Sequence, residues 1–166
     1  MAQEQVDLNL SVGYALKHAA AALRGAMDAA LRPLALSVPQ YACLELLGQR
    51  AGLSAAELAR GAFVTRQSMH AVLQGLQDRA LLTRPASPPQ GRALPTQLTA
   101  HGTRLLRHAS RAVADVEHRM LHTLPASSQD RLREDLTACT AALNAERNQR
   151  GLLPVGDAVV HPSTST

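Results

Sequence analysis

Apolar positions recur every three or four residues along most of the chain, the spacing that builds one buried stripe on an α-helix. The sharpest example follows Thr65, where a polar face lies opposite an apolar face made by Met69, Val72, Leu73 and Leu76. The same period runs through residues 7–31, 37–49, 99–124 and 127–147. Pro33 and Pro125 separate neighbouring stripes, because proline interrupts a helix. The pattern predicts a mostly α protein.

Capping residues mark where several of these helices begin. Ser37 and Ser54 each precede a Gln or Glu by three residues, the capping-box spacing that satisfies the free N–H groups of a first helical turn. The Thr65 hydroxyl can cap a helix in the same way, and Thr99 and Ser127 stand before the two last stripes. Residues 54–84 therefore predict a helix, a turn, a second helix and the start of a strand.

A short hairpin is predicted directly after this helix-turn-helix. Residues 81–84 and 93–98 suit extended strands, and the segment PASPPQGR between them has the proline and glycine density of a loop. A hairpin in this place is the wing of a winged helix. The wing arginine, Arg92, could then reach a minor groove or a phosphate. An ordinary hairpin with a solvated arginine is the alternative.

The polar face of the second helix carries the candidate chemistry. Its first turns hold Arg66, Gln67, Ser68 and His70, whose side chains can hydrogen-bond to base edges or phosphates in a major groove. A merely solvated face, on a winged helix that binds protein and not DNA, is the competing interpretation. The capping residues and the arginines of the predicted wing complete the set. The candidate DNA-binding residues are therefore Ser54, Thr65, Arg66, Gln67, Ser68, His70, Arg84 and Arg92.

Charge favours the DNA-binding interpretation. The net charge is only +4, but residues 53–107 hold seven arginines against the two carboxylates of Glu57 and Asp78. A basic region around a reading helix is the electrostatic footprint of a nucleic-acid binder. The chain lacks a Gly-rich phosphate loop, a nucleophile elbow and an HExxH motif, so we expect neither an enzyme nor a cofactor. Without a long apolar run or a signal-peptide pattern, we expect a cytoplasmic protein with no membrane contact.

Histidine and cysteine give weaker candidates. His118 and His122 are four residues apart and could share one helix face as metal ligands, although a solvated or packed pair is the preferred interpretation. Cys43 could sense oxidants, but a reactive thiol needs exposure and a depressed pKa, and we interpret Cys43 as a core residue. With Cys139 far away in sequence, both cysteines are expected to be free, buried thiols.

The terminal helices predict a homodimer. Their apolar stripes have no evident partner within the chain, and pairing with a second copy would bury them. A two-fold dimer places two reading helices about 34 Å apart, which predicts a near-palindromic DNA operator. The expected organisation is an N-terminal dimerisation helix (1–36), a winged helix-turn-helix (37–98), a long helix with a C-terminal dimerisation helix (99–150) and a disordered tail (151–166).

In this order of elements the chain resembles the multiple antibiotic resistance regulator (MarR) family of winged-helix repressors. The resemblance is carried by the segments LSVPQYACLELL, LSAAELARGAFVTRQSMHAVLQGLQDRALLTR and LTAHGTRLL. It implies an obligate homodimer with Arg66, Gln67, Ser68 and His70 at DNA-reading positions and Arg92 at the wing arginine. It also implies a small, often phenolic or aromatic ligand that lodges between the dimer helices and the reading head and weakens DNA binding.

The chain departs from the family pattern at two places. Its wing lacks the acidic residue that usually braces the wing arginines, and Ala80 stands where the family favours glycine after the reading helix. Ala80 predicts a less sharply ended helix, because alanine is strained at a positive φ. A regulator of the same fold that responds to oxidants or zinc remains the alternative to one released by a small molecule.

Overall fold

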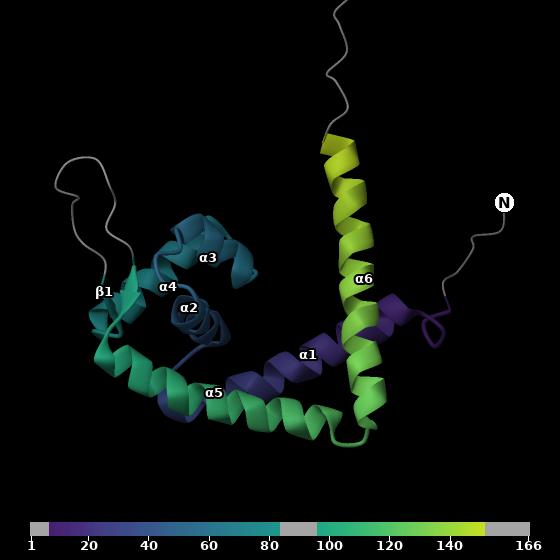
Figure 1. Cartoon of the computed structure of the whole chain (residues 1–166), viewed down its shortest axis with the longest axis horizontal. Helices are drawn as coiled ribbons and strands as arrows, with labels where there is room; N and C mark the ends of the chain where they lie inside the picture. Colours follow the sequence, from purple (N-terminus) through teal and green to yellow (C-terminus); the bar gives the residue numbers. More distant parts are fainter. Residues whose placement is uncertain (1–6, 84–95, 152–166) are drawn as a thin grey trace, which may run out of the picture. The chain divides into compact units, whose positions relative to one another are not determined.

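The computed structural model describes residues 7–83 and 96–151, and side chains as far as residue 145. The chain forms two compact units, Met1–Met120 and Leu121–Thr166. The α-helices, labelled in Figure 1, are α1 (Val12–Leu31), α2 (Val38–Gln49), α3 (Ala55–Gly61), α4 (Arg66–Asp78), α5 (Ala100–Leu121) and α6 (Ala126–Gly151). The short 3-10 helix η1 (Arg32–Leu34) follows α1. The strands β1 (Leu82–Thr83) and β2 (Gln97–Leu98) pair antiparallel, with Leu82 opposite Leu98.

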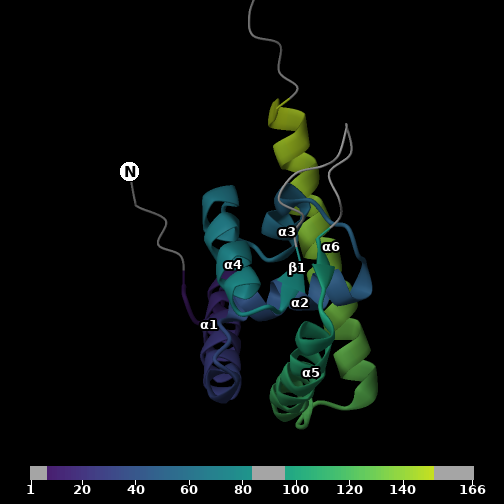
Figure 2. The ribbon, with the colours of Figure 1, turned by 90° about the vertical axis from the view of Figure 1, so that its left-hand side faces the viewer.

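Helices α2, α3 and α4 pack against one another beside β1, and Figures 1 and 2 show this group from two sides. We call it, with β1 and β2, the reading head. Its core is aliphatic. The fully buried side chains within it are Cys43, Leu44, Leu58, Met69, Leu73, Leu76, Leu81 and Leu82. A helix-turn-helix followed by a two-stranded antiparallel sheet confirms the predicted mostly α, winged-helix fold.

The predicted helix starts are mostly confirmed. Capping boxes form at Ser37 with Gln40 and at Ser54 with Glu57, and the Thr65 hydroxyl accepts a hydrogen bond from the Ser68 N–H. Thr99 caps α5 by accepting from the Gly102 N–H at 2.9 Å. These local sequence signals work because each cap needs only groups that lie three residues apart.

Several boundaries differ from the prediction. Helix α1 begins at Val12, capped by Ser11, and not near Asp7. Helix α5 ends at Leu121, three residues before the expected Leu124. Helix α6 already begins at Ala126, because the Pro125 carbonyl accepts the first backbone hydrogen bonds, from Ser128 and Gln129. The predicted start at Ser127 was therefore wrong by one residue.

The predicted tail also needs a correction at its first residue. Gly151 is the last residue of α6 and not the first residue of the tail. The rest of that tail, 152–166, lies outside the described residues, as do 84–95 with the whole predicted wing loop.

Three helices end in the same backbone motif, with a non-glycine residue in the left-handed conformation. Ala35, Phe63 and Ala80 have φ angles of 51°, 55° and 53°. In each case the residue after them donates its N–H back to the carbonyl five positions earlier, for example Leu81 to Leu76 at 3.0 Å. This is the Schellman motif, which usually places glycine at the left-handed position. Helix α4 therefore ends sharply at Asp78, and the less sharp end expected from Ala80 was wrong.

Gly102 fixes how α5 leaves the reading head. A Cβ atom there would lie 1.9 Å from the Leu81 carbonyl oxygen, so only glycine allows this approach. Two bonds from Thr99 reinforce the joint: its hydroxyl donates to the Ala80 carbonyl at 2.7 Å, and its N–H donates to the Leu81 carbonyl at 3.1 Å. The end of α4 and the start of α5 are thereby held together within the first unit.

The second unit consists of the turn after α5 and helix α6. The Gln129 side chain closes the turn by donating to the Leu121 and Leu124 carbonyls at 3.2 and 2.9 Å. Along α6, Leu132, Leu136 and Leu143 recur at helical spacing and are exposed in the single chain. The unit therefore carries an apolar stripe without a buried core of its own among the described residues.

Candidate nucleic-acid interface

Helix α4 is oriented by one buried face. Met69, Leu73 and Leu76 are fully buried in the core of the reading head, which turns the opposite face of the helix toward solvent. The four predicted reading residues, Arg66, Gln67, Ser68 and His70, are all exposed on the first turns of α4. The structure thus brings them together on one accessible surface at the N-terminal end of the helix.

Thr65 and Ser68 form a small hydrogen-bonded pair at this end of α4. The Thr65 hydroxyl oxygen accepts from the Ser68 N–H at 3.1 Å, and the Thr65 hydroxyl donates to the Ser68 Oγ at 2.9 Å. The pair holds both side chains in fixed orientations beside Arg66 and Gln67. Thr65 therefore has a structural role as cap, and its contact with DNA stays a prediction.

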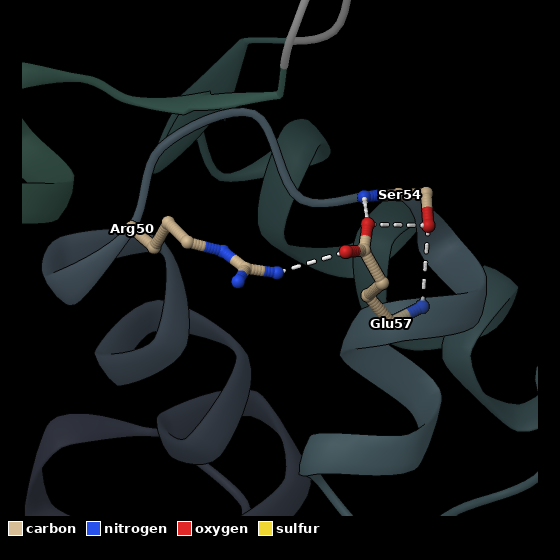
Figure 3. A network of polar contacts seen from close by, with 3 residues as sticks. All are labelled: Arg50, Ser54 and Glu57. Atoms are coloured by element: carbon tan, nitrogen blue, oxygen red, sulfur yellow. Dashed lines mark hydrogen bonds and ion pairs between the residues drawn. The ribbon is translucent and has the colours of Figure 1, made fainter.

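Ser54 belongs to a second polar network, at the start of α3 (Figure 3). Its N–H and hydroxyl both donate to one Glu57 oxygen at 2.8 Å, while Arg50 donates to the other oxygen, also at 2.8 Å. The hydrogen bond from the Ser54 backbone, then that from its hydroxyl, and the positive charge of Arg50 hold the pKa of Glu57 below its usual value. The network fixes the first turn of α3, and a DNA contact of Ser54 remains a prediction.

The arginines of the head do not all serve one purpose. Arg79 donates to the Ala35 carbonyl at 2.6 Å and to the Leu34 carbonyl at 3.2 Å, so it closes the end of η1. Arg79 is one of the seven arginines that make residues 53–107 basic, but its hydrogen bonds give it a structural role. Arg84 and Arg92, the two predicted wing contacts, lie outside the described residues.

The weaker metal and redox candidates are two histidines and two cysteines. His118 lies on α5 and His122 comes directly after the last residue of that helix, so a shared face for the two histidines stays a prediction. Among the described residues, no group of three or more His, Cys, Asp or Glu side chains could hold a metal ion. Cys43 is fully buried, as interpreted from the sequence, but Cys139 is exposed on α6, so its expected burial was wrong.

A cleft whose lining residues the sequence did not identify lies between α2, β2 and α5. Its volume is about 620 Å³, and Leu47, Leu98 and Leu106 form part of its lining. Polar groups from α2 and α5 also line it, namely Glu45, Gln49, Arg107, Ser110 and Arg111. No spacing rule could have shown this cleft, because Glu45 and Ser110 are 65 positions apart in the chain.

Glu45 is a polar group of the cleft that accepts hydrogen bonds from three side chains. It accepts hydrogen bonds from Ser110 at 2.8 Å, Gln49 at 3.0 Å and the Tyr41 hydroxyl at 3.2 Å. Partial burial raises the pKa of Glu45, but these hydrogen bonds together outweigh it and bring that pKa below its usual value. Burial also raises the pKa of Tyr41, which therefore keeps its proton at neutral pH. The cleft thus presents an ionised carboxylate on one wall and two arginines on α5.

The fold and the exposed face of α4 define a winged-helix protein of the helix-turn-helix class. Residues 36–93 match the model of the MarR family. The HTH-type transcriptional repressor Rv2887 of Mycobacterium tuberculosis is 46% identical over 118 residues, which cover 71% of this chain and 85% of that repressor. The chain therefore belongs to the MarR family of dimeric winged-helix transcriptional regulators.

Two crystal structures of that relative are similar to this chain. The complex of Rv2887 with salicylic acid has a TM-score of 0.66 at 43% identity, over 78% of this chain and 96% of that one. The complex of Rv2887 with DNA has a TM-score of 0.66 at 40% identity, over 78% of this chain and 97% of that one. Separately, no helix in residues 7–83 and 96–151 is long and apolar enough to cross a membrane.

Proposed function

We propose that this protein is a homodimeric transcriptional repressor that binds a near-palindromic operator and is released from it by a small aromatic acid. The observation that carries the proposal is the exposed polar face at the start of α4, with Arg66, Gln67, Ser68 and His70. N-terminal residues of a recognition helix are the ones that contact base edges. The DNA complex of the relative Rv2887 supports the same role.

Arg66 gives the most direct test of DNA binding. An arginine that contacts a guanine or a phosphate contributes roughly a tenfold or larger gain in affinity, so Arg66→Ala should weaken operator binding by at least that factor. Fluorescence anisotropy on the DNA upstream of the gene, against scrambled DNA and across a salt series, measures it. Arg24→Ala is the matched control, because Arg24 is exposed on α1, where it pairs with Asp28. Unchanged binding by Arg66→Ala, with the dimer intact, would refute the assignment of α4.

The cleft between α2, β2 and α5 is the proposed ligand site. Arg107 and Arg111 are one helical turn apart on α5 and suit a carboxylate, while the Glu45 carboxylate can accept from a ligand hydroxyl. The leucines of the lining supply contacts for an aromatic ring, and the volume is in the usual range of small-molecule sites. The relative solved with salicylic acid supports this ligand class.

Salicylate is the probe for this site. Salicylate should release operator DNA from the parent protein, and Arg107→Ala and Arg111→Ala should require about tenfold more of it, since charged hydrogen bonds are lost. Arg104→Ala is the control, because Arg104 is exposed on the same helix but does not line the cleft. Release that is equally efficient in all three variants would place the ligand elsewhere.

Release requires that the ligand bind one arrangement of the dimer better than another. We propose that occupancy of the cleft changes the separation of the two α4 helices, because α5 both lines the cleft and joins the reading head through Gly102. Small-angle scattering with and without salicylate measures that separation. An unchanged profile in the presence of a saturating, DNA-releasing ligand would refute this mechanism.

The remaining parts of the proposal are a cytoplasmic location, no catalytic activity, and a response to a small molecule. A response to zinc or an oxidant is less well supported, because Cys43 is buried and the described histidines form no ligand cluster. A winged helix that binds only protein would not need the exposed polar face of α4.

A further inference from the structure

Phe63 breaks two local rules of protein structure at once. It is 95% exposed, although it is one of only three aromatic residues in the chain. It also adopts a left-handed φ of 55°, which is strained for any residue that carries a Cβ. An exposed aromatic ring at a strained backbone position points to a function.

The fold itself does not require an aromatic side chain at this position. Phe63 closes α3 in the same Schellman motif in which Ala35 closes η1 and Ala80 closes α4. In all three motifs the following residue, Leu36, Val64 or Leu81, is the one that packs toward the core. The left-handed residue points outward, and alanine serves there twice.

The position of Phe63 also separates it from the other exposed apolar residues. Among the described residues, every other exposed large apolar side chain lies at or before α1, at the end of α5, or in the second unit. Phe63 instead lies in the turn of the helix-turn-helix, two residues before the cap Thr65 and three before Arg66. Its neighbours in sequence are thus the reading residues, and not the apolar stripes of the terminal helices.

We propose that Phe63 reads a thymine of the operator through apolar contact with its 5-methyl group. The inference rests on the proposed function, in which the start of α4 enters the major groove. A phenylalanine ring offers no hydrogen bond to a base edge, and the thymine methyl is the one apolar group that a base pair presents in that groove. Contact with it would cover the exposed ring and give sequence preference at a base pair next to those read by Arg66 and Gln67.

The test uses duplexes selected by the full-length parent protein from a random DNA pool. Each thymine of a half-site is replaced in turn by uracil, which lacks only the 5-methyl group. The parent should lose about fivefold or more in affinity at one such position, the lower range for a base-pair change in a specific site. Phe63→Ala and Phe63→Asn should bind the thymine duplex more weakly by a similar factor and should no longer distinguish uracil at that position.

Controls separate this reading role from folding. Asparagine is tolerated at left-handed positions, and alanine already occupies two equivalent ones, so both variants should keep the melting temperature within about 2 °C. Ala80→Gly is the matched control, because it changes a left-handed residue that ends α4, away from the reading surface. It should leave both the affinity and the uracil sensitivity unchanged.

The outcomes distinguish this inference from the proposed function. If Phe63→Ala binds as tightly as the parent, or keeps the uracil sensitivity, the inference is wrong while operator binding stands. If the variants lose affinity but no uracil position affects the parent, Phe63 contacts the sugar-phosphate backbone and the thymine contact is refuted. If selection yields no preferred sequence, the proposed function is refuted, and this inference is refuted together with it.

Discussion

The reading head and the helices α1 and α6 use apolar residues in opposite ways. In the head, Leu44, Leu58 and Leu73 are fully buried by contacts within one chain. In α1 the apolar period is just as regular, yet Val12 and Leu16 stay 77% and 45% exposed. In α6, Leu143 is 70% exposed. Periodicity alone therefore says that a helix has an apolar face, but not which molecule covers it.

The contrast has a physical reason. Short helices joined by tight turns can surround a common core, whereas a long helix presents more apolar length than one small partner can cover. The family is dimeric, and we propose that pairing with a second copy covers these stripes. We accordingly expect the stability of the head to depend mainly on its own core, and that of α1 and α6 to depend on protein concentration.

The largest effect is expected in the core of the head. Leu73→Ala should lower the free energy of unfolding by about 2–5 kcal/mol, because Leu73 is fully buried and its truncation leaves a cavity. Urea unfolding at a fixed protein concentration measures this change. Leu16→Ala on α1 is the matched control and should cost clearly less. Equal losses of stability in the two variants would contradict the contrast between the reading head and α1.

The second-largest effect is expected where α5 joins the reading head. Gly102→Ala should destabilise the protein by about 3 kcal/mol, the upper end for overpacking, because the new Cβ meets a backbone carbonyl that cannot move cheaply. Gly25→Ala on α1 has nothing within 4 Å and should stabilise the helix by about 0.5–1 kcal/mol. Thermal unfolding of both variants gives the comparison. If Gly102→Ala left the stability unchanged, the close approach of Gly102 to the Leu81 carbonyl would be refuted.

Charged substitutions in the apolar stripes of α1 and α6 should weaken the dimer but leave the folding of the reading head unchanged. Leu16→Glu and Leu136→Glu should each raise the dissociation constant of the dimer about tenfold or more, since each places a charge on an apolar face. Sedimentation equilibrium measures this constant. Phe63→Ala, which removes an exposed apolar side chain outside these stripes, should leave it unchanged. Dimers of normal strength in both Glu variants would assign the interface to other surfaces.

The smallest effect concerns pH. Because the pKa of Glu45 is below its ordinary value of 4.5 in the folded chain, the carboxylate contributes stability that is present above that value. This contribution is lost as the pH falls through the folded pKa. Glu45→Gln should therefore show a shallower loss of stability below about pH 4.5 than the parent. Parallel unfolding curves for the two proteins across that range would contradict the assignment.

Much of the interface could be predicted because its signals are local. Thr65 caps α4 through an N–H three residues away, and Met69, Leu73 and Leu76 define the buried face from spacing alone. The exposed positions of Arg66 and His70 follow from that face. The exposed apolar ring of Phe63 could not be foreseen, because the left-handed position in a Schellman motif usually belongs to glycine.

The sequence by itself determined the helices, most of their caps, the winged-helix order and the polar face of α4, because these features depend on residues a few positions apart. Only the tertiary structure decided that Arg79 closes η1 across 44 positions, that Ser110 on α5 holds Glu45 on α2, and that Gly102 lies against the Leu81 carbonyl. These contacts join residues far apart in the chain. No periodicity encodes them, since they arise only when packing of the aliphatic core brings separate helices together.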